Sequence, residues 1–358
     1  MKKMVHIVGN LAPGGMGSFL MNLYRNIDRE KVQFDFIVMG EKAVNYHDAA
    51  KELGANIYKV SGLSKNPVKY FLEIKNIIKQ NQYDVVFRHT DVATIAIDLI
   101  AARMGGAKRR IPHSHSTDSK HLLAHKLLRP VLVANATEYF ACSEPAAEWM
   151  YGENICKNKK YQLVKNGIDL NRYAYDPTVR KEKRNELGIE EDTLVIGHVG
   201  NFVYAKNHLF LLEIFAKVLE RQPRAKLLLA GDGELRAEIE KKIEDLGIKE
   251  HVMLLGIRND IPKLLQVVDV YLFPSVYEGL PVALVEAQAA GLPCVISDTI
   301  APESKITNHI ESYSLQLSIE EWAQKVLGWS GYERTDSTDV LRKAGYDIME
   351  TVRMYEAL

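Results

Sequence analysis

Short apolar runs alternate with longer amphipathic segments along almost the whole chain. Runs of about four to eight apolar residues between turns are typical of buried strands, and apolar residues three and four positions apart are typical of helices. Strands are expected at 33–39, 85–88, 111–115, 139–142, 226–230, 252–255, 270–273 and 293–297. Helices are expected at 17–27, 67–81, 178–187, 207–221, 233–246, 261–267, 281–290 and 339–358. This alternation predicts parallel sheets covered by helices, the α/β class.

One pattern occurs twice, at residues 4–11 and 195–202. Each copy is an apolar run that ends at Gly-Asn and leads through a loop into a helical pattern, as the first strand of a doubly wound unit does. A chain of 358 residues is long enough for two cores. The sequence therefore predicts two Rossmann-like domains, 1–165 and 166–338, and a final helix, 339–358, that packs back toward the first domain.

The composition is that of an ordinary soluble globular protein, with 47% hydrophobic and 26% charged residues. No apolar run approaches the roughly 18 residues of a membrane span, and the first residues lack the apolar core of a secretory signal. The three cysteines (Cys142, Cys156 and Cys294) are odd in number and widely spaced, so they form neither a disulfide framework nor a zinc motif. We therefore expect a protein of the reducing cytoplasm.

The net charge of zero conceals an asymmetry between the two halves. Residues 1–165 carry 24 Lys and Arg against 15 Asp and Glu, whereas residues 166–358 carry 22 against 31. Within residues 103–129, seven basic residues accompany one acidic residue, Asp118. A basic half favours an anionic partner such as phosphates, a membrane surface or nucleic acid. The alternative is a solvated basic face that complements the acidic half.

Two loops that follow predicted strands have the character of phosphate-binding turns. Gly14, Gly15 and Gly17 follow the first strand, and glycines allow backbone amides to approach a phosphate closely. Their spacing fits neither the dinucleotide fingerprint nor the P-loop, so tight-turn geometry without a ligand is the alternative. Lys206 precedes a helix in the second half, where a lysine meets a diphosphate as a point charge or is simply exposed.

A third loop, 275–287, places two carboxylates around a predicted helix start. Pro281 suits the first turn of that helix, so the amides of Gly279 and Leu280 lie where an anion is stabilised. Glu278 precedes the helix, and Glu286 follows eight residues later. Two carboxylates repel a phosphate, but they accept hydrogen bonds from sugar or ribose hydroxyls. The alternative is a pair of solvated glutamates.

A polar cluster that includes His113 and His115 ends another predicted strand. Two histidines two positions apart on a strand share one face and could bind a metal. No third ligand stands at motif spacing, so a polar role at a cleft is favoured over zinc, and no metal site is expected. His6, His47, His251 and His309 have the pattern of ordinary surface or core histidines. The sequence also lacks D-x-D, G-x-S-x-G, H-E-x-x-H and the protein-kinase motifs.

Together these segments resemble the retaining glycosyltransferases of the GT-B fold, family 4, which use nucleotide sugars. Glu278 and Glu286 match the E-x7-E pair of that family, and residues 14–17 match its glycine loop. Further similar segments are the linker 165–169, the donor-domain loops 231–235 and 256–262, and residues 345–348. The pattern is similar to bacterial exopolysaccharide and capsule transferases. The resemblance implies two Rossmann-like domains that face each other across a cleft.

The resemblance also implies a role for each matching residue. Glu286 would accept hydrogen bonds from the ribose, and Glu278 would contact the donor sugar. Lys206 and the amides of Gly279 and Leu280, next to Pro281, would hold the diphosphate. Gly15 and Met16, in the glycine loop between Gly14 and Gly17, would close over it from the other domain. His115 matches a histidine near the donor sugar and acceptor, and Arg258 lies in the loop that borders the nucleobase. Asn201 stands where the family usually has arginine, so one positive charge at the phosphates is missing.

The implied activity is metal-independent transfer of a hexose-type sugar, with retention, from a nucleotide sugar, most commonly a UDP-sugar. No cofactor is expected, because the nucleotide sugar is a substrate. The implied acceptor is a saccharide, and the basic first half fits one carried on a lipid diphosphate. Residues 120–129 mix cationic and apolar side chains as an interfacial helix does, which fits peripheral contact with the anionic inner face of the plasma membrane. Nucleic acid is not an expected partner.

Three other functions remain open from the residues alone. A nucleotide-sugar epimerase shares the architecture. A dinucleotide-dependent oxidoreductase needs an acidic residue after the second strand, where Glu41 stands, although the glycine spacing does not fit. A sugar-nucleotide-binding relative without activity is consistent with Asn201.

Overall fold

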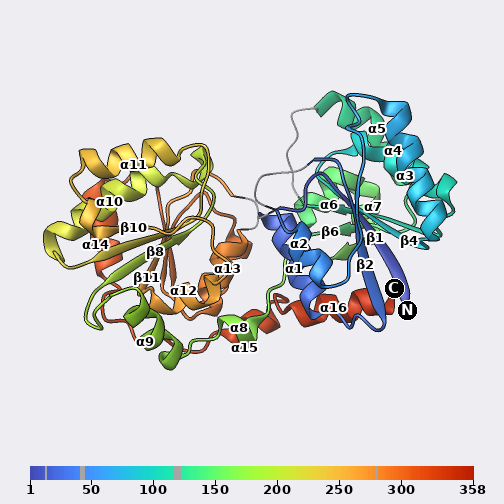
Figure 1. Cartoon of the computed structure of the whole chain (residues 1–358). Coiled ribbons are helices and arrows are strands. Elements are labelled where there is room, and N and C mark those ends of the chain that lie inside the picture. Colours follow the sequence, from blue (N-terminus) through green and yellow to red (C-terminus); the bar gives the residue numbers. More distant parts are fainter. Residues whose placement is uncertain (13, 41–44, 116–121, 279–280) are drawn as a thin grey trace. The chain divides into compact units, whose positions relative to one another are not determined.

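The computed structural model describes residues 1–12, 14–40, 45–115, 122–278 and 281–358. It divides into two compact units, and each is described by itself. Unit 1 comprises Met1–Gly167 and Ile348–Leu358, and unit 2 comprises Ile168–Asp347. Each unit contains a parallel sheet with helices packed against it (Figure 1).

Unit 1 is built on a seven-stranded sheet with the order β3-β2-β1-β4-β5-β6-β7. Its strands are β1 (Lys2–Val8), β2 (Val32–Val38), β3 (Ile57–Lys59), β4 (Val85–Thr90), β5 (Arg109–Ser114), β6 (Phe140–Ala141) and β7 (Gln162–Leu163). Its α-helices are α1 (Gly15–Asn26), α2 (His47–Glu52), α3 (Pro67–Asn81), α4 (Ala96–Gly105), α5 (Leu122–Asn135), α6 (Glu144–Tyr151), α7 (Glu153–Lys157) and α16 (Ile348–Ala357), with a short 3₁₀ turn, η1 (Ala93–Ile95).

Unit 2 is built on a six-stranded sheet with the order β10-β9-β8-β11-β12-β13. Its strands are β8 (Val195–Val199), β9 (Lys226–Ala230), β10 (Val252–Leu254), β11 (Val270–Phe273), β12 (Cys294–Ser297) and β13 (Ile310–Tyr313). Its α-helices are α8 (Leu170–Tyr173), α9 (Pro177–Glu186), α10 (His208–Arg221), α11 (Arg236–Asp245), α12 (Ile261–Val267), α13 (Val282–Ala289), α14 (Ile319–Leu327) and α15 (Thr338–Lys343). Its 3₁₀ turns are η2 (Tyr204–Lys206), η3 (Lys249–His251) and η4 (Pro302–Ser304).

Both sheets have the doubly wound strand order, so the prediction of two similar α/β halves is confirmed. The first strand of each unit lies inside its sheet: Met4 of β1 pairs with Phe34 and Val85, and Ile196 of β8 pairs with Leu227 and Val270. The chain order reverses between β1 and β4 and between β8 and β11. In such sheets, ligands bind beyond the carboxyl ends of the strands at this reversal.

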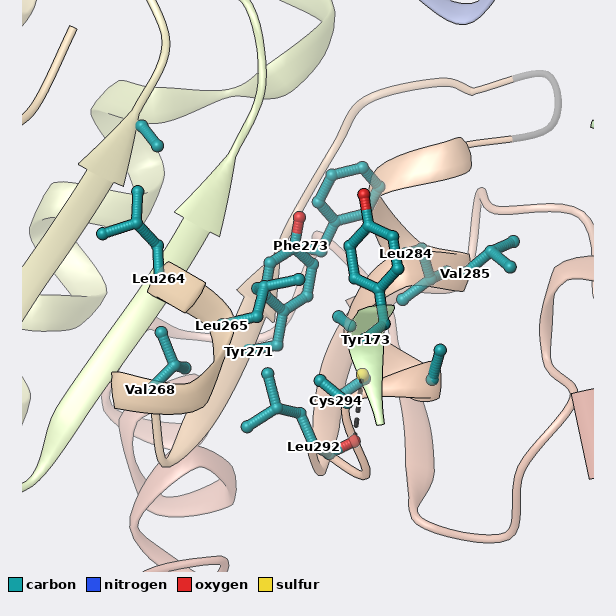
Figure 2. Packing of buried hydrophobic residues seen from close by; sticks show 14 of the residues in the cluster. Tyr173, Leu264, Leu265, Val268, Tyr271, Phe273, Leu284, Val285, Leu292 and Cys294 are labelled. Carbon is teal, nitrogen blue, oxygen red and sulfur yellow. Dashed lines mark hydrogen bonds between the residues drawn. The ribbon is translucent and has the colours of Figure 1, made fainter. Parts of the chain in front are cut away.

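The sheet of unit 2 has an apolar core on each face, because successive strand residues point to opposite sides. Leu227 and Leu229 of β9 pack in the cluster that contains Trp322 of α14. Leu228, between them, packs in the cluster that contains Leu264 of α12. Figure 2 shows this second cluster, in which Tyr173 of α8 lies among side chains of β11, β12 and α13. Helix α8 is therefore fixed against the face of the sheet that carries α13.

The prediction of a single helix over residues 339–358 is wrong, because the structure divides this segment into two helices, α15 and α16. Helix α15 ends before Gly345, which has a φ of 78° that a residue with a side chain rarely adopts. Tyr346 is buried in the core of unit 2, and Asp347 forms a β-bridge with Ile168. Helix α16 instead packs in unit 1, where its Tyr355 ring stacks 4.8 Å from Phe87. The amphipathic pattern continues through both helices, so periodicity alone does not reveal the break.

Three arginines bind the carbonyl groups at the end of α12. Arg180 and Arg334 donate to carbonyl oxygens within residues 265–268, and Arg184 donates to the carbonyl of Val267. These carbonyls have no partner within their own helix, and the helix dipole favours cations there. Asp269 accepts from Arg180 and Arg184 at 2.7 Å each and from the amide of Val195 at 2.7 Å. The Asp269 carboxylate thus connects α9, α12 and the start of β8.

Candidate functional site

The loops that follow β8 and β11 are joined at the reversal of the unit 2 sheet. The amide of Val276 donates to the carbonyl of Ala205 at 2.8 Å, and the side-chain amide of Asn207 donates to the carbonyl of Pro274 at 3.0 Å. Asn207 has a φ of 55°, a left-handed conformation that asparagine tolerates. These bonds hold the two loops that carry Lys206 and Glu278 beside each other.

Lys206 and Glu278, which the sequence predicts as site residues, form an ion pair. The Lys206 Nζ donates to Glu278 Oε1 at 2.6 Å, and the two side chains are only 16% and 12% exposed. The ammonium also lies 4.6 Å from the centroid of the Phe273 ring, within the range of a cation–π contact. A Cβ on Gly200 would lie 3.2 Å from Lys206 Cε, so a residue without a side chain leaves room for the lysine. The cation is therefore held in one orientation before any ligand binds.

Glu286 lies in the second turn of α13 and has a partner that the sequence does not reveal. The Tyr173 hydroxyl donates to Glu286 Oε1 at 2.6 Å. Burial raises the pKa of Glu286 to about 7, although the hydrogen bond from Tyr173 and the charge of Arg172 lower it. The two residues are 113 positions apart, so no local pattern connects them. The Tyr173 hydroxyl thus orients one of the two carboxylate oxygens of Glu286.

Of the other predicted site residues of unit 2 that the structure describes, Arg258 and Asn201 are exposed and Pro281 is buried. Pro281 is the N-cap of α13 rather than a residue of its first turn, because the helix begins at Val282. Arg258 forms a two-bond ion pair with Asp260, at 2.8 and 2.7 Å. Asn201 is exposed in the loop after β8. The amides assigned to Gly279 and Leu280 lie outside the described residues, as does Glu41 in unit 1.

In unit 1, the glycine loop forms the start of α1. Gly14 is the N-cap with a φ of 139°, and its carbonyl accepts from Ser18 at 2.8 Å. A Cβ on Gly17 would lie 2.0 Å from the carbonyl oxygen of Ala12, so only glycine fits there. Gly15 has open space around its Cα, and Met16 packs against the core of the unit. The first amides of α1 point outward and, with the helix dipole, favour an anion.

His115 follows β5 and lies beside two other histidines. Its ring centroid is 4.1 Å from that of His113, and its Nε2 lies 2.9 Å from Nδ1 of His89. One nitrogen atom from each of the three histidines lies within 4.8 Å of the others. The third histidine, which sequence spacing does not reveal, is therefore His89 of β4. Neutral imidazoles of this kind suit zinc, copper, iron or nickel. Both nitrogens of His89 already take part in hydrogen bonds, however, so a metal ion would have to displace one.

The comparisons with known proteins agree with this architecture. The profile of Glycosyltransferase Family 4 matches residues 13–172, and the profile of Glycosyl transferases group 1 matches residues 179–329. The chain is 36% identical to putative glycosyltransferase EpsF of Bacillus subtilis, over 98% of this chain and 94% of that protein. It is 29% identical to UDP-Gal:alpha-D-GlcNAc-diphosphoundecaprenol alpha-1,3-galactosyltransferase of Escherichia coli, over 70% of this chain and 67% of that protein.

Solved structures share the fold across the whole chain. Anabaena Alr3699/HepE in complex with UDP-glucose superposes with a TM-score of 0.77 at 18% identity, covering 100% of this chain and 98% of that one. The fold is therefore that of the GT-B glycosyltransferases. The chain belongs to the group 1, family 4 glycosyltransferases, as its motifs predict. Among the helices that the structure describes, none has both the length and the apolar character of a membrane span.

Proposed function

We propose that this protein is a metal-independent, retaining transferase that moves a hexose-type sugar from a UDP-sugar to a saccharide acceptor in exopolysaccharide or capsule synthesis. The observation that carries the proposal is the Lys206–Glu278 pair with Glu286, at the reversal of the unit 2 sheet of a family 4 chain. This arrangement offers one fixed cation for a diphosphate and two carboxylates for hydroxyl groups.

The names of the relatives support the choice of substrates. The relative from E. coli is a galactosyltransferase that uses UDP-Gal and a diphosphoundecaprenol-linked acceptor. Capsular polysaccharide biosynthesis glycosyltransferase CapH of Staphylococcus aureus is 24% identical over 91% of this chain. The structural neighbour from Anabaena was solved with UDP-glucose. These names favour a UDP-sugar donor and a saccharide acceptor on a lipid diphosphate.

In the proposed reaction, the bond between the anomeric carbon and the diphosphate oxygen breaks while an acceptor hydroxyl bonds to the same carbon. The electron pair of the broken bond stays on the diphosphate, and the acceptor proton passes to an oxygen of this leaving group. A dedicated base is therefore not required. Lys206 would stabilise the negative charge that develops on the diphosphate, as preorganised donors do in other group transfers. Asn201 supplies no charge, so Lys206 carries a larger share of this task.

The proposal is tested first by ligand stabilisation and then by transfer, both in EDTA. UDP, UDP-glucose, UDP-galactose, UDP-N-acetylglucosamine, GDP-mannose and NAD are compared by thermal shift. A ligand at about 100 times its dissociation constant adds about 2.7 kcal/mol of stability, enough for a shift of several degrees. We expect stabilisation by UDP-sugars, followed by transfer to a lipid-diphosphate saccharide with an unchanged anomeric configuration by NMR.

Other outcomes of these assays separate the alternatives. An epimerised donor formed without acceptor indicates an epimerase. A response to NAD alone indicates an oxidoreductase, and binding of a UDP-sugar without turnover indicates a non-catalytic relative. Transfer that EDTA abolishes and Mg²⁺ restores contradicts metal independence.

Donor affinity is expected to rise with pH through about 7. Below the pKa of about 7, Glu286 carries a proton, and above it the ionised carboxylate accepts hydroxyl hydrogen bonds more strongly. Tyr173→Phe removes a hydrogen bond that lowers this pKa, so the midpoint should move to higher pH. The measurement is calorimetric titration with the stabilising UDP-sugar, whose diphosphate does not titrate in this range.

Glu286→Gln provides the matched control for this pH dependence. Its amide keeps the size of the side chain and does not titrate, so affinity should be lower and flat with pH. A wild-type affinity that does not change between about pH 6 and 8 would remove Glu286 from the nucleotide site. An unchanged midpoint in Tyr173→Phe would remove the tyrosine from the control of that carboxylate.

We also propose that α5 contacts an anionic membrane surface. Leu123 and Leu127, one helical turn apart, are 73% and 68% exposed. Lys126 and Arg129 lie on the same helix, and the described helix contains no acidic residue. These cations also line a pocket of about 350 Å³ together with His125 and with Pro145, Glu148 and Trp149 of α6. Lys120 and His121, which the sequence includes in this segment, lie outside the described residues.

Sedimentation with anionic vesicles at low salt tests this contact. Replacing both Leu123 and Leu127 with glutamine is expected to reduce the bound fraction several-fold, because the exposed apolar area is lost. The matched control replaces Val68 and Leu72 of α3, also one turn apart and 68% and 44% exposed. Equal loss in both double variants, or no vesicle binding by the wild-type protein, contradicts the proposal.

A further inference from the structure

Three histidines from neighbouring strands form a continuous hydrogen-bonded chain inside unit 1. Nδ1 of His6 lies 2.9 Å from Nε2 of His89, and Nδ1 of His89 lies 2.9 Å from Nε2 of His115. His6 is on β1, His89 is on β4 and His115 follows β5, which are adjacent in the sheet. His89 is the central member, because both of its nitrogens take part. The chain runs from the core of the unit to the residue that the sequence assigns to the substrate site.

Each of these imidazoles is neutral near pH 7 and so carries a single N–H. Burial lowers the pKa of His6 and His115 to about 3 and lowers the pKa of His89 well below its usual range. A neutral imidazole has one donor and one acceptor nitrogen. Two hydrogen bonds in series therefore require all three rings to have the same tautomer. Either every Nδ1 carries the proton, or every Nε2 does.

The two arrangements differ at the free ends of the chain. With protons on every Nδ1, His115 presents an N–H at its free Nδ1, and Nε2 of His6 is bare. With protons on every Nε2, His115 presents a lone pair, and His6 places an N–H in the core. Among the described residues, neither His115 Nδ1 nor His6 Nε2 has a hydrogen-bond partner. The surroundings of His6 therefore decide between the arrangements.

The burial of His6 favours the first arrangement. His6 is 0% exposed, whereas His115 is only partly buried. The rings of Phe34, Phe36 and Phe87 lie around His6, and no described residue, the buried Tyr355 hydroxyl included, accepts a hydrogen bond from its Nε2. A buried N–H without an acceptor is rare in folded proteins and costs free energy. The unpaired N–H is therefore favoured at the His115 end, where a substrate oxygen can accept it.

We propose that this chain holds His115 in its Nδ1–H tautomer, so that it donates a hydrogen bond to a hydroxyl or phosphate oxygen of the substrate. His89 is then a positioning residue that acts through His115, and the burial of His6 sets the direction of the protons. The identity of the substrate rests on the proposed function, whereas the tautomer does not. His113 lies beside the chain but makes no hydrogen bond with its members among the described contacts.

The tautomers are measured directly in the full-length protein labelled with ¹⁵N-histidine. Long-range ¹H–¹⁵N correlation spectra report which nitrogen of each ring carries the proton, and single substitutions assign the signals. We expect His6, His89 and His115 all to be Nδ1–H, the less common tautomer of histidine in water. An Nε2–H tautomer at His115 in the wild-type protein overturns the proposal without any assay of activity.

Two substitutions of His89 separate positioning from packing. His89→Asn places an amide where Nδ1 was, and this group can still donate to His115; His89→Leu cannot. We expect the asparagine variant to keep the Nδ1–H signal and most of the activity. The leucine variant should lose that signal and about 10-fold in kcat, with little change in the KM of the donor. If His115 has the same tautomer and kcat has the same value in both variants, His89 does not position His115.

Additional measurements test the proposal even if a variant of His89 does not fold. His47→Leu, a buried histidine of unit 1 outside the chain, should leave the signals of His6 and His115 and the value of kcat unchanged. A stoichiometric tetrahedral Co²⁺ spectrum that requires His89, His113 and His115 would mean a metal site instead of the chain. Tautomers as expected with no sugar transfer would retain the chain and reject the proposed function.

Discussion

Replacing Lys206 with alanine is expected to lower kcat for sugar transfer about 100-fold, the effect of removing one preorganised donor from a developing negative charge. The effect should be near or above this value, because Asn201 leaves no second cation at the position where the family usually has arginine. The ammonium is also fixed in advance, by Glu278 at 2.6 Å and by the Phe273 ring. Initial rates over a range of donor concentrations separate kcat from KM.

Lys217→Ala is the matched control for this variant. Lys217 lies on α10, the helix that follows the site loop, and its ion pair with Glu220 is exposed. Its loss should not change kcat. Lys206→Arg keeps the charge in a different shape and should retain part of the activity. Because alanine also leaves the partly buried Glu278 without a cation, melting temperatures are recorded for each variant. Wild-type kcat in Lys206→Ala would remove this residue from the mechanism.

Asp269→Asn is expected to destabilise unit 2 by about 3–5 kcal/mol, as the loss of one partner from a buried ion pair does. The carboxylate accepts from Arg180, Arg184 and the amide of Val195 at 2.7 Å each. Arg184 is only 1% exposed, so its charge has no access to water when the carboxylate is gone. Burial and the charge of Arg180 already lower the pKa of the nearby Arg334 to about 9, which indicates how costly a further uncompensated cation is.

Thermal unfolding measures this effect, with a decrease in melting temperature of roughly 10 °C expected for a unit of this size. Asp192→Asn is the control, because its ion pair with Arg224 is exposed and such pairs contribute little. Equal melting temperatures in the two variants would show that the carbonyls of α12 stabilise the arginines without Asp269. Since β11 leads from Asp269 to the loop of Glu278, the variant should also weaken donor binding.

Several elements follow from short-range patterns and were predicted with the observed bounds. The helices at 67–81 and 261–267 and the strands at 226–230 and 270–273 are examples. Pro67 and Pro262 near the helix starts and uninterrupted apolar strand runs are local signals that tertiary contacts reinforce. The break at Gly345 also has a local signal, a glycine after a short helix, but an amphipathic pattern continues on both sides of it.

The residues of the candidate site also fall into those that local patterns reveal and those that only the folded chain reveals. Glu278, Glu286 and Lys206 are recognisable because a strand end, a loop and a helix start lie within a few residues of each. The partner of Glu286 is not recognisable, because Tyr173 lies 113 positions away. The histidine chain of unit 1 is not recognisable either, because His6 lies 83 positions from His89. His6 has the pattern of an ordinary core histidine, and only the order of β1, β4 and β5 in the sheet reveals its neighbours.

Sequence patterns alone predict the α/β class, the repeated first strand, the loops that carry the chemistry and the family. Each of these depends on residue spacing within one or two elements. The group that orients Glu286, the histidines that form a chain with His115 and the point where the C-terminal segment divides are visible only in the folded chain. Hydrogen bonds between side chains require distances near 3 Å, and parallel sheets bring together strands that are far apart in the chain. Sequence spacing contains no measure of those distances, so the contacts that position the predicted site emerge only when the sheets are assembled.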